Sequence, residues 1–211
     1  SIEMSHDCLE YFKNFSKINN IYLLLGSIPI TENDKLFNRS ILINPDGDII
    51  SIYDKIHMFD ITLKNGESYK ESDFYSPGSE LKITKVLGHS IGHTICYDLR
   101  YPKLYRALAK KGSQIIVVPS AFTHTTGKAH WHSLIKARAI ENGVFILAPN
   151  QWGVNNEKRV TYGHTLIVDP WGETLAEAED GETIIAAELD LNRVKECQNA
   201  IPVLDNDRNF D

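Results

Sequence analysis

The stretch IGHTICYDLRYP, residues 91–102, joins a buried strand to a helix. Its first half is apolar and predicts a strand over Ser90–Cys96. Pro102 suits the first turn of a helix over Lys103–Lys111, because its fixed φ is helical and its missing N–H has no partner there. Gly112 ends that helix. A chain that passes from strand to turn to helix in this way favours an α/β layered fold.

The segments on either side of this stretch alternate between helices and strands. Leu9, Phe12 and Phe15 recur near helical spacing and predict a helix over Ser5–Ile18. Pro45-Asp46-Gly47 is a turn signal and predicts a hairpin. The hairpin strands are Asn38–Asn44 and Asp48–Tyr53, and the other predicted strands are Ile21–Leu25, Gln114–Val118, Val144–Ala148, Thr165–Asp169, Glu173–Ala176 and Ile184–Glu188. The other predicted helices are Ala129–Asn142 and Leu191–Gln198, and Lys64–Gly78 is predicted to be a surface loop.

Composition favours one globular domain over residues 1–211 and excludes several classes of protein. Apolar residues make up 42% and charged residues 24%, which argues against disorder. The net charge of -6, without a Lys/Arg cluster, argues against nucleic-acid binding. No apolar run reaches the length of a membrane span, and the N-terminus of the given sequence carries no signal segment, so no membrane partner is expected. The sparse cysteines Cys8, Cys96 and Cys197 predict neither disulfides nor a zinc quartet, which favours the cytoplasm.

Cys96 is the main candidate for chemistry. A strand-to-helix turn exposes a side chain at the end of a sheet, and the N–H groups of such a turn suit a developing oxyanion. The nearby helix N-terminus favours a thiolate. A free cysteine is also commonly a buried structural residue, and position alone is compatible with both interpretations.

Two charged residues are candidates to act with Cys96. Lys55 follows a strand in YDKIHMFD, residues 53–60, where an ammonium could stabilise an oxyanion. Glu71, in YKES, residues 69–72, could orient that ammonium or transfer protons. Taken alone, each is more typical of a solvated surface. His93 is an unsuitable base for Cys96, because residues three apart on a strand face opposite sides.

The histidines give little support for a metal site, so no metal or cofactor is expected. His130 and His132 are two residues apart on a predicted helix and point in different directions, so they cannot hold one ion together. His164 is isolated in a strand-like segment. A metal-binding protein that uses the His-rich stretch 124–132 stays open as a weaker alternative.

Taken together, these strings resemble the three-part signature of the nitrilase superfamily. The segments around Lys55, Glu71 and Cys96 follow the order of that signature. PSAF (119–122), TGKAHWHSLIKARAIENG (126–143) and YGHTLIVDPWGE (162–173) resemble the branch that contains deaminated-glutathione amidase and omega-amidase. The resemblance covers essentially the whole chain. It implies an α-β-β-α sandwich, a homodimer and a Glu-Lys-Cys triad.

The resemblance also assigns roles to individual residues. Cys96 is the implied nucleophile, and Lys55 and the N–H of Tyr97 stabilise the oxyanion. Glu71 matches the second Glu of the amidase branch. The implied reaction is hydrolysis of a small carboxylate-bearing amide, with ammonia released and a thioester formed. Arg100 is the candidate partner of the substrate carboxylate, with a structural ion pair to Asp98 as its alternative, and Phe122 is a further candidate for substrate binding. The strings 97–102 and 119–122 lean toward deaminated-glutathione amidase.

The family's first Glu, its general base, has no counterpart in this sequence. Ser1–Ile18 resembles the helix that follows that Glu, and Glu3 and Glu10 stand in a different context. We therefore expect the chain as given to lack the N-terminal strand-helix-strand portion and to be inactive alone. A non-catalytic homologue that only binds a ligand or partner is the alternative.

Overall fold

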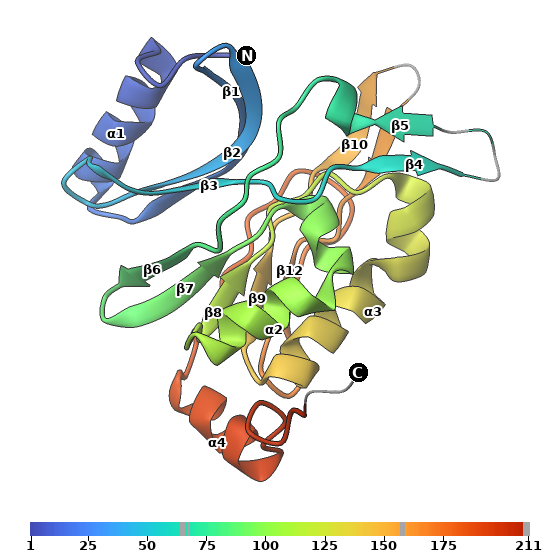
Figure 1. The fold of residues 1–211 in the computed structure, drawn as a ribbon. Coiled ribbons are helices and arrows are strands. Elements are labelled where there is room, and N and C mark those ends of the chain that lie inside the picture. Colours follow the sequence, from blue (N-terminus) through green and yellow to red (C-terminus); the bar gives the residue numbers. More distant parts are fainter. Residues whose placement is uncertain (64–65, 67, 157–158, 209–211) are drawn as a thin grey trace.

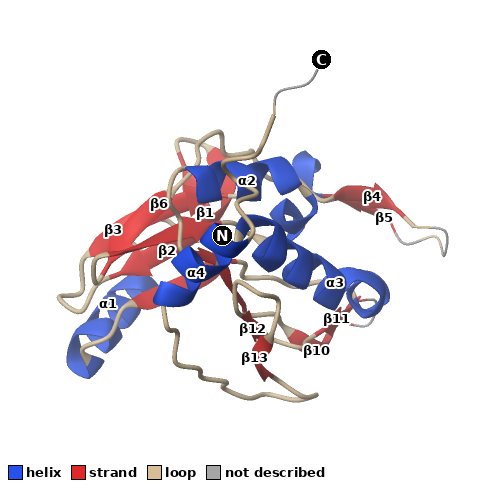
Figure 2. Ribbon diagram, turned by 90° about the horizontal axis from the view of Figure 1, so that it is seen from below, coloured by secondary structure: helices blue, strands red, loops and turns tan. Residues whose placement is uncertain are grey.

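The computed structural model describes residues 1–211 except 64, 65, 67, 157, 158 and 209–211. Its helices and strands form two main sheets with helices on their outer faces (Figures 1 and 2). The helices are α1 (Asp7–Asn19), α2 (Pro102–Lys110), α3 (His124–Asn142), α4 (Asn192–Ala200) and the short 3₁₀ helices η1 (Glu71–Asp73) and η2 (Cys96–Arg100). The strands are β1 (Leu23–Glu32), β2 (Lys35–Ile43), β3 (Ile49–Asp54), β4 (Asp60–Thr62), β5 (Ser68–Lys70), β6 (Ile83–Val86), β7 (His89–His93), β8 (Ile115–Val117), β9 (Phe145–Ala148), β10 (Trp152–Asn156), β11 (Arg159–Tyr162), β12 (Leu166–Val168) and β13 (Thr174–Glu177).

The first sheet is an antiparallel meander in the order β1-β2-β3. Asn33 and Asp34 join β1 to β2 and both have positive φ, the backbone that a tight hairpin turn requires. The predicted turn at residues 45–47 joins β2 to β3. Leu9 of α1 packs on a buried cluster of Leu25, Ile30, Ile41 and Ile43, so α1 covers the outer face of this sheet.

The second sheet has six strands in the order β13-β12-β9-β8-β7-β6. Its centre, β7-β8-β9, is parallel and its outer pairs are antiparallel. Such central strands are buried on both faces and consist almost entirely of apolar residues. α2 and α3 cover one face, where Leu108 and Trp131 join Ile116 and Ile146 in a buried cluster (Figure 1).

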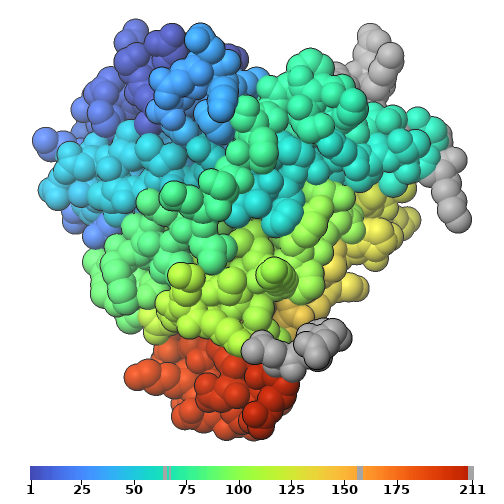
Figure 3. All heavy atoms as spheres, in the orientation of Figure 1, coloured from blue at the N-terminus to red at the C-terminus, as the bar shows by residue number. Residues whose placement is uncertain are grey.

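The two sheets contact each other through polar and aromatic side chains. The hydroxyl of Thr84 on β6 donates to that of Ser51 on β3 at 2.6 Å. The rings of Tyr53 on β3 and His93 on β7 lie 6.5 Å apart. In Figure 3 the N-terminal layer, in blue, adjoins the second sheet, while α4, in red, lies at the opposite end. This arrangement brings the end of β3 close to the turn after β7.

The mixed α/β class is confirmed, and most predicted elements are present with shifted ends. The strand predicted over Ile184–Glu188 is wrong: these residues have no regular structure, and Ile184 is 95% exposed. An apolar run forms a strand only where another strand pairs with it, and no described strand pairs here. The predicted loop over Lys64–Gly78 contains β5 and η1, although 64, 65 and 67 lie outside the described residues. None of the helices described is long and apolar enough to span a membrane.

Candidate active site

Cys96 occupies the turn that leads from β7 into η2. Its φ is +47°, in the left-handed region that residues with a Cβ seldom adopt. The turn is fixed by the Cys96 N–H, which donates to the carbonyl oxygen of Pro119 at 3.0 Å. A strained backbone at the end of a strand is a recurrent feature of catalytic nucleophiles, because the turn directs their side chains out of the sheet.

The fully buried carboxylate of Asp98 holds this turn in place. It accepts hydrogen bonds from the Ile95 N–H at 2.9 Å, the His57 N–H at 3.0 Å and the Tyr53 hydroxyl at 2.7 Å. The His57 ring also contacts it, through Nδ1, at 2.7 Å. Burial, together with the charge of Asp98, raises the pKa of Tyr53 far above its ordinary value, so Tyr53 stays a neutral donor.

The buried Lys55 and the largely buried Glu71 form an ion pair beside that turn. Lys55 directly follows β3, and its backbone N–H donates to the carbonyl oxygen of Asn38 at 3.0 Å. Its ammonium is paired with Oε2 of Glu71, the first residue of η1. That same oxygen accepts from the Phe59 N–H at 2.7 Å, while Oε1 accepts from the Asn38 amide at 3.1 Å. Both oxygens of Glu71 therefore accept hydrogen bonds, and Oε2 is the one that orients Lys55.

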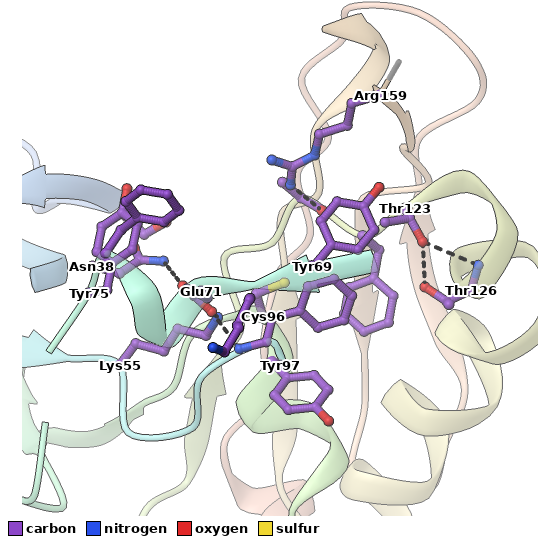
Figure 4. Close-up of a pocket in the computed structure, with 16 residues that line it drawn as sticks. Asn38, Lys55, Tyr69, Glu71, Tyr75, Cys96, Tyr97, Thr123, Thr126 and Arg159 are labelled. Carbon is purple, nitrogen blue, oxygen red and sulfur yellow. Dashed lines mark hydrogen bonds and ion pairs between the residues drawn. The ribbon is translucent and has the colours of Figure 1, made fainter. Parts of the chain in front are cut away.

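Cys96, Lys55 and Glu71 line one cavity of about 300 Å³. Figure 4 shows Cys96 between the Lys55–Glu71 pair and the ring of Tyr69. The remaining lining side chains comprise an aromatic set and a mainly polar set: Phe59, Tyr69, Phe74, Tyr75, Tyr97 and Phe122, and Ser27, Asn38, Lys70, Ala121, Thr123, Thr126 and Arg159. An apolar cavity with a few convergent polar groups is typical of a small-molecule site.

Tyr97 lines the cavity, and its peptide N–H differs in its hydrogen bonding from those on either side. Its neighbours are already engaged, since the Cys96 N–H binds Pro119 and the Asp98 N–H donates to the Ile95 carbonyl at 3.0 Å. Across the part of the chain that is described, the Tyr97 N–H has no such acceptor. Lys55, whose ammonium is paired with Glu71, lines the same cavity.

Of the residues predicted from sequence, Cys96, Lys55, Glu71, Tyr97 and Phe122 all line this cavity, whereas Arg100 does not. The Arg100 guanidinium instead lies 3.3 Å from His130 Nδ1 and over the ring of Phe122 at 5.4 Å. Burial lowers the pKa of Arg100. The alternative ion pair with Asp98 is not formed either, because that carboxylate binds Tyr53, His57 and Ile95 as described above.

Arg159 is the arginine among the described residues that line the cavity, and no motif in the sequence pointed to it. It begins β11, and its guanidinium donates to the Ala121 carbonyl at 3.2 Å. β10 and β11 form a hairpin that the sequence pattern did not predict. Arg159 lies 63 residues after Cys96 in the sequence, so only the folded hairpin reveals that the two share a site.

His93 lies outside the cavity, as the strand alternation predicted. Its Nε2 is 3.1 Å from the Thr84 hydroxyl, and its ring faces Tyr53 between the sheets. Burial, with a smaller effect from the charge of Lys82, lowers the pKa of His93 to about 4. It is therefore neutral near pH 7, and it is not among the residues that line the cavity with Cys96.

Comparisons with known proteins identify relatives of the chain. The carbon-nitrogen hydrolase family model matches residues 2–199. A deaminated glutathione amidase of Dictyostelium discoideum is 39% identical over 201 residues, covering 92% of this chain and 69% of that protein. Omega-amidase NIT2 of Xenopus tropicalis is 38% identical over 194 residues, covering 92% and 70%. The crystal structure of Saccharomyces cerevisiae Nit3, a member of branch 10 of the nitrilase superfamily, superposes with a TM-score of 0.85 at 33% identity, covering 96% and 72%.

Proposed function

The chain belongs to the carbon-nitrogen hydrolase family of the nitrilase superfamily, and we propose that it hydrolyses small carboxylate-bearing amides through a thioester on Cys96. The observation that carries the proposal is the strained turn at Cys96, which shares one cavity with the buried Lys55–Glu71 pair. A thiol, a fixed cation and a spare peptide N–H in one cavity are the groups that acyl transfer needs. The chain spans about two thirds of the length of its amidase relatives.

The proposed reaction has two halves. The Cys96 thiolate attacks the amide carbon, and the ammonium of Lys55 and the Tyr97 N–H stabilise the resulting oxyanion. The tetrahedral intermediate then expels ammonia, whose nitrogen takes up the proton that the thiol lost, and leaves a thioester. Water attacks that thioester in the second half, which releases the carboxylic acid and restores the thiol.

Glu71 is a positioning residue in this proposal and not the base. It is the one carboxylate among the described residues that line the cavity, and both of its oxygens already accept hydrogen bonds. The proton of Cys96 therefore needs another acceptor, the part played by the family's first Glu. This same observation favours the second candidate function, a homologue that binds amides without hydrolysing them.

Arg159 is the proposed partner of the substrate carboxylate, in place of Arg100. Its planar guanidinium lies in the cavity wall and can bind a carboxylate through two parallel hydrogen bonds. The similarity to both a deaminated glutathione amidase and an omega-amidase supports a small amide with a carboxylate, and we favour the first activity from the strings at 97–102 and 119–122. We also interpret the layers as the superfamily's α-β-β-α sandwich, and expect a homodimer in the cytoplasm without a cofactor.

The test compares the chain as given with a chimera that carries, ahead of Ser1, the corresponding segment of the Dictyostelium discoideum relative. Both are assayed for ammonia release from a panel of small amides, and Cys96→Ala is the matched control. We expect turnover in the chimera alone, together with a thioester on Cys96 in the intact mass. Turnover that survives Cys96→Ala would exclude Cys96 as the nucleophile. Amide binding by both proteins without ammonia release would favour the non-catalytic homologue, and equal turnover by both would make the base a residue of this chain.

A further inference from the structure

Three side chains from separate segments meet on the surface, away from the cavity of Cys96. His132 belongs to α3, His164 precedes β12, and Glu177 is the last residue of β13. Oε1 of Glu177 lies 2.8 Å from His132 Nε2 and 2.9 Å from His164 Nδ1. One nitrogen or oxygen atom from each residue lies within 4.8 Å of the other two. None of the three lines the cavity described above.

This cluster is a different combination of histidines from the one that the sequence suggested. His130 and His132 point apart on α3, as their spacing predicts, and His130 contacts Arg100 at 3.3 Å. His132 instead meets His164, which lies 32 residues later in the chain and is isolated in sequence. Their rings are 5.3 Å apart in an edge-to-face arrangement. The fold thus brings together two imidazoles that spacing alone does not connect.

His164 is held more firmly than an ordinary surface histidine. Its φ is +56°, another left-handed conformation at a residue with a Cβ. Its carbonyl oxygen accepts a 2.7 Å hydrogen bond from the indole of the fully buried Trp131. Its ring stacks on that of Tyr162 with centroids 4.4 Å apart. Preorganised ligands lose less conformational entropy when they bind, which is a feature of built sites.

We propose that His132, His164 and Glu177 form a binding site for a divalent transition-metal ion of the Zn²⁺ class. Two imidazoles and one carboxylate are a ligand set that Zn²⁺ accepts, with the remaining position taken by water. At zinc–ligand bonds of 2.0–2.2 Å, tetrahedral ligand atoms lie roughly 3.4 Å apart. The atoms of this cluster are 2.8 Å to at most 4.8 Å apart, so small side-chain rotations suffice.

A second carboxylate supports this assignment. Oδ1 of Asp180, which accepts a 3.2 Å hydrogen bond from the indole of Trp152, lies at an ion-pair distance of 4.0 Å from Nε2 of His164, the ring nitrogen opposite the one that faces Glu177. Histidines that bind metals commonly present their other nitrogen to a carboxylate, which fixes the tautomer and strengthens the ligand. His164 therefore has a candidate partner on each ring nitrogen.

The role that fits the position is structural. The ion joins α3 to β13, the edge strand of the six-stranded sheet, and to the turn that precedes β12. The side chains of His132, His164 and Glu177 are 35%, 26% and 36% exposed, so an ion can enter from solvent. An ion that binds the folded chain and not the unfolded chain stabilises the folded state. The site is independent of the proposed amide hydrolysis.

The test is a titration of the metal-free chain with ZnCl₂. Calorimetry measures the binding, and the change in the thermal midpoint of unfolding measures the stabilisation. Cys96→Ser serves as background, because a thiol also binds zinc. We expect one zinc ion per chain and a higher thermal midpoint. His132→Ala and Glu177→Gln should each weaken zinc binding by about 10- to 100-fold or more. His130→Ala, two residues away on the same helix, should leave zinc affinity unchanged.

Glu177→Gln keeps the size of the side chain, and circular dichroism checks that the variant folds. A loss of zinc binding in this variant therefore reports on the carboxylate of Glu177 as a metal ligand. Zinc affinity equal in His132→Ala, Glu177→Gln and the Cys96→Ser background would overturn the proposal. Absence of zinc binding to the background would also overturn it, leaving Glu177 as a hydrogen-bond acceptor for two histidines. A loss caused by His130→Ala would place the ion on the His-rich stretch 124–132 instead.

Discussion

The hydroxyl of Tyr53 donates a 2.7 Å hydrogen bond to the carboxylate of Asp98. Tyr53, on β3 of the first sheet, lies two residues before Lys55, and Asp98, in η2 after β7 of the second sheet, lies two residues after Cys96. This one buried contact therefore joins the segment that carries the cation to the turn that carries the thiol. His57, two residues after Lys55, binds the same carboxylate through its backbone and its ring.

Replacing Asp98 should damage both the stability and the site. Asp98→Asn keeps the volume of the side chain, but its NH₂ group cannot accept a hydrogen bond. At least one N–H or O–H that donates to Asp98 therefore loses its acceptor. A hydrogen bond to a buried charged group contributes about 1.5–3 kcal/mol, so we expect a loss of about 3 kcal/mol or more in the free energy of unfolding. Urea unfolding measures it, and Tyr53→Phe, which removes one donor, should cost less. An Asp98→Asn protein as stable as the parent would show that this carboxylate does not hold the two segments together.

Lys55 should matter to catalysis as well as to stability, and neutralising Glu71 separates the two effects. Lys55→Met leaves Glu71 as an uncompensated buried carboxylate, which typically costs about 3–5 kcal/mol in stability. Adding Glu71→Gln removes that charge and should recover much of the stability. In the chimera that carries the upstream segment, ammonia release should stay about 10²–10³-fold lower with both variants, because the oxyanion has lost a donor. If turnover returns together with stability in the double variant, Lys55 serves only the fold.

Arg159 should determine selectivity for amides with a carboxylate. Arg159→Gln removes a charge-assisted pair of hydrogen bonds worth about 1.5–3 kcal/mol, roughly a 10- to 150-fold rise in KM for such a substrate. A neutral amide of equal length is the control, and its KM should change little. Steady-state kinetics of the chimera with both substrates measures the difference. An equal rise for both would mean that Arg159 shapes the cavity without binding the carboxylate.

His93 should make the protein less stable in mild acid. Its pKa is lowered to about 4 in the folded chain, from 6.5. Between these values the unfolded chain binds a proton that the folded chain does not, so stability is full above pH 6.5 and falls as the pH drops toward 4. The shift corresponds to about 3 kcal/mol. Urea unfolding between pH 7.5 and 4.5 measures the slope, which should be shallower in His93→Gln; identical slopes would assign the acid sensitivity to other groups.

The sequence by itself determined the features that depend on neighbours along the chain. The strand, turn and Pro-initiated helix around Cys96, the hairpin turn at residues 45–47 and most helices follow from local preferences of φ, from apolar periodicity and from turn residues. The segments around Lys55, Glu71 and Cys96 were recognisable for the same reason, since each is a short contiguous string. Their meeting in one cavity is a property of the fold.

Only the tertiary structure decided which distant residues come together. Arg159 rather than Arg100 lines the cavity, because Arg159 begins the second strand of the unpredicted β10–β11 hairpin. Glu71 binds Lys55 with both oxygens occupied, and His132 pairs with His164 rather than with His130. The apolar run at 184–188 has no strand beside it among the described residues and forms no regular structure. The physical reason is that sheet register and helix packing set distances between residues tens of positions apart, whereas local preferences act over only a few.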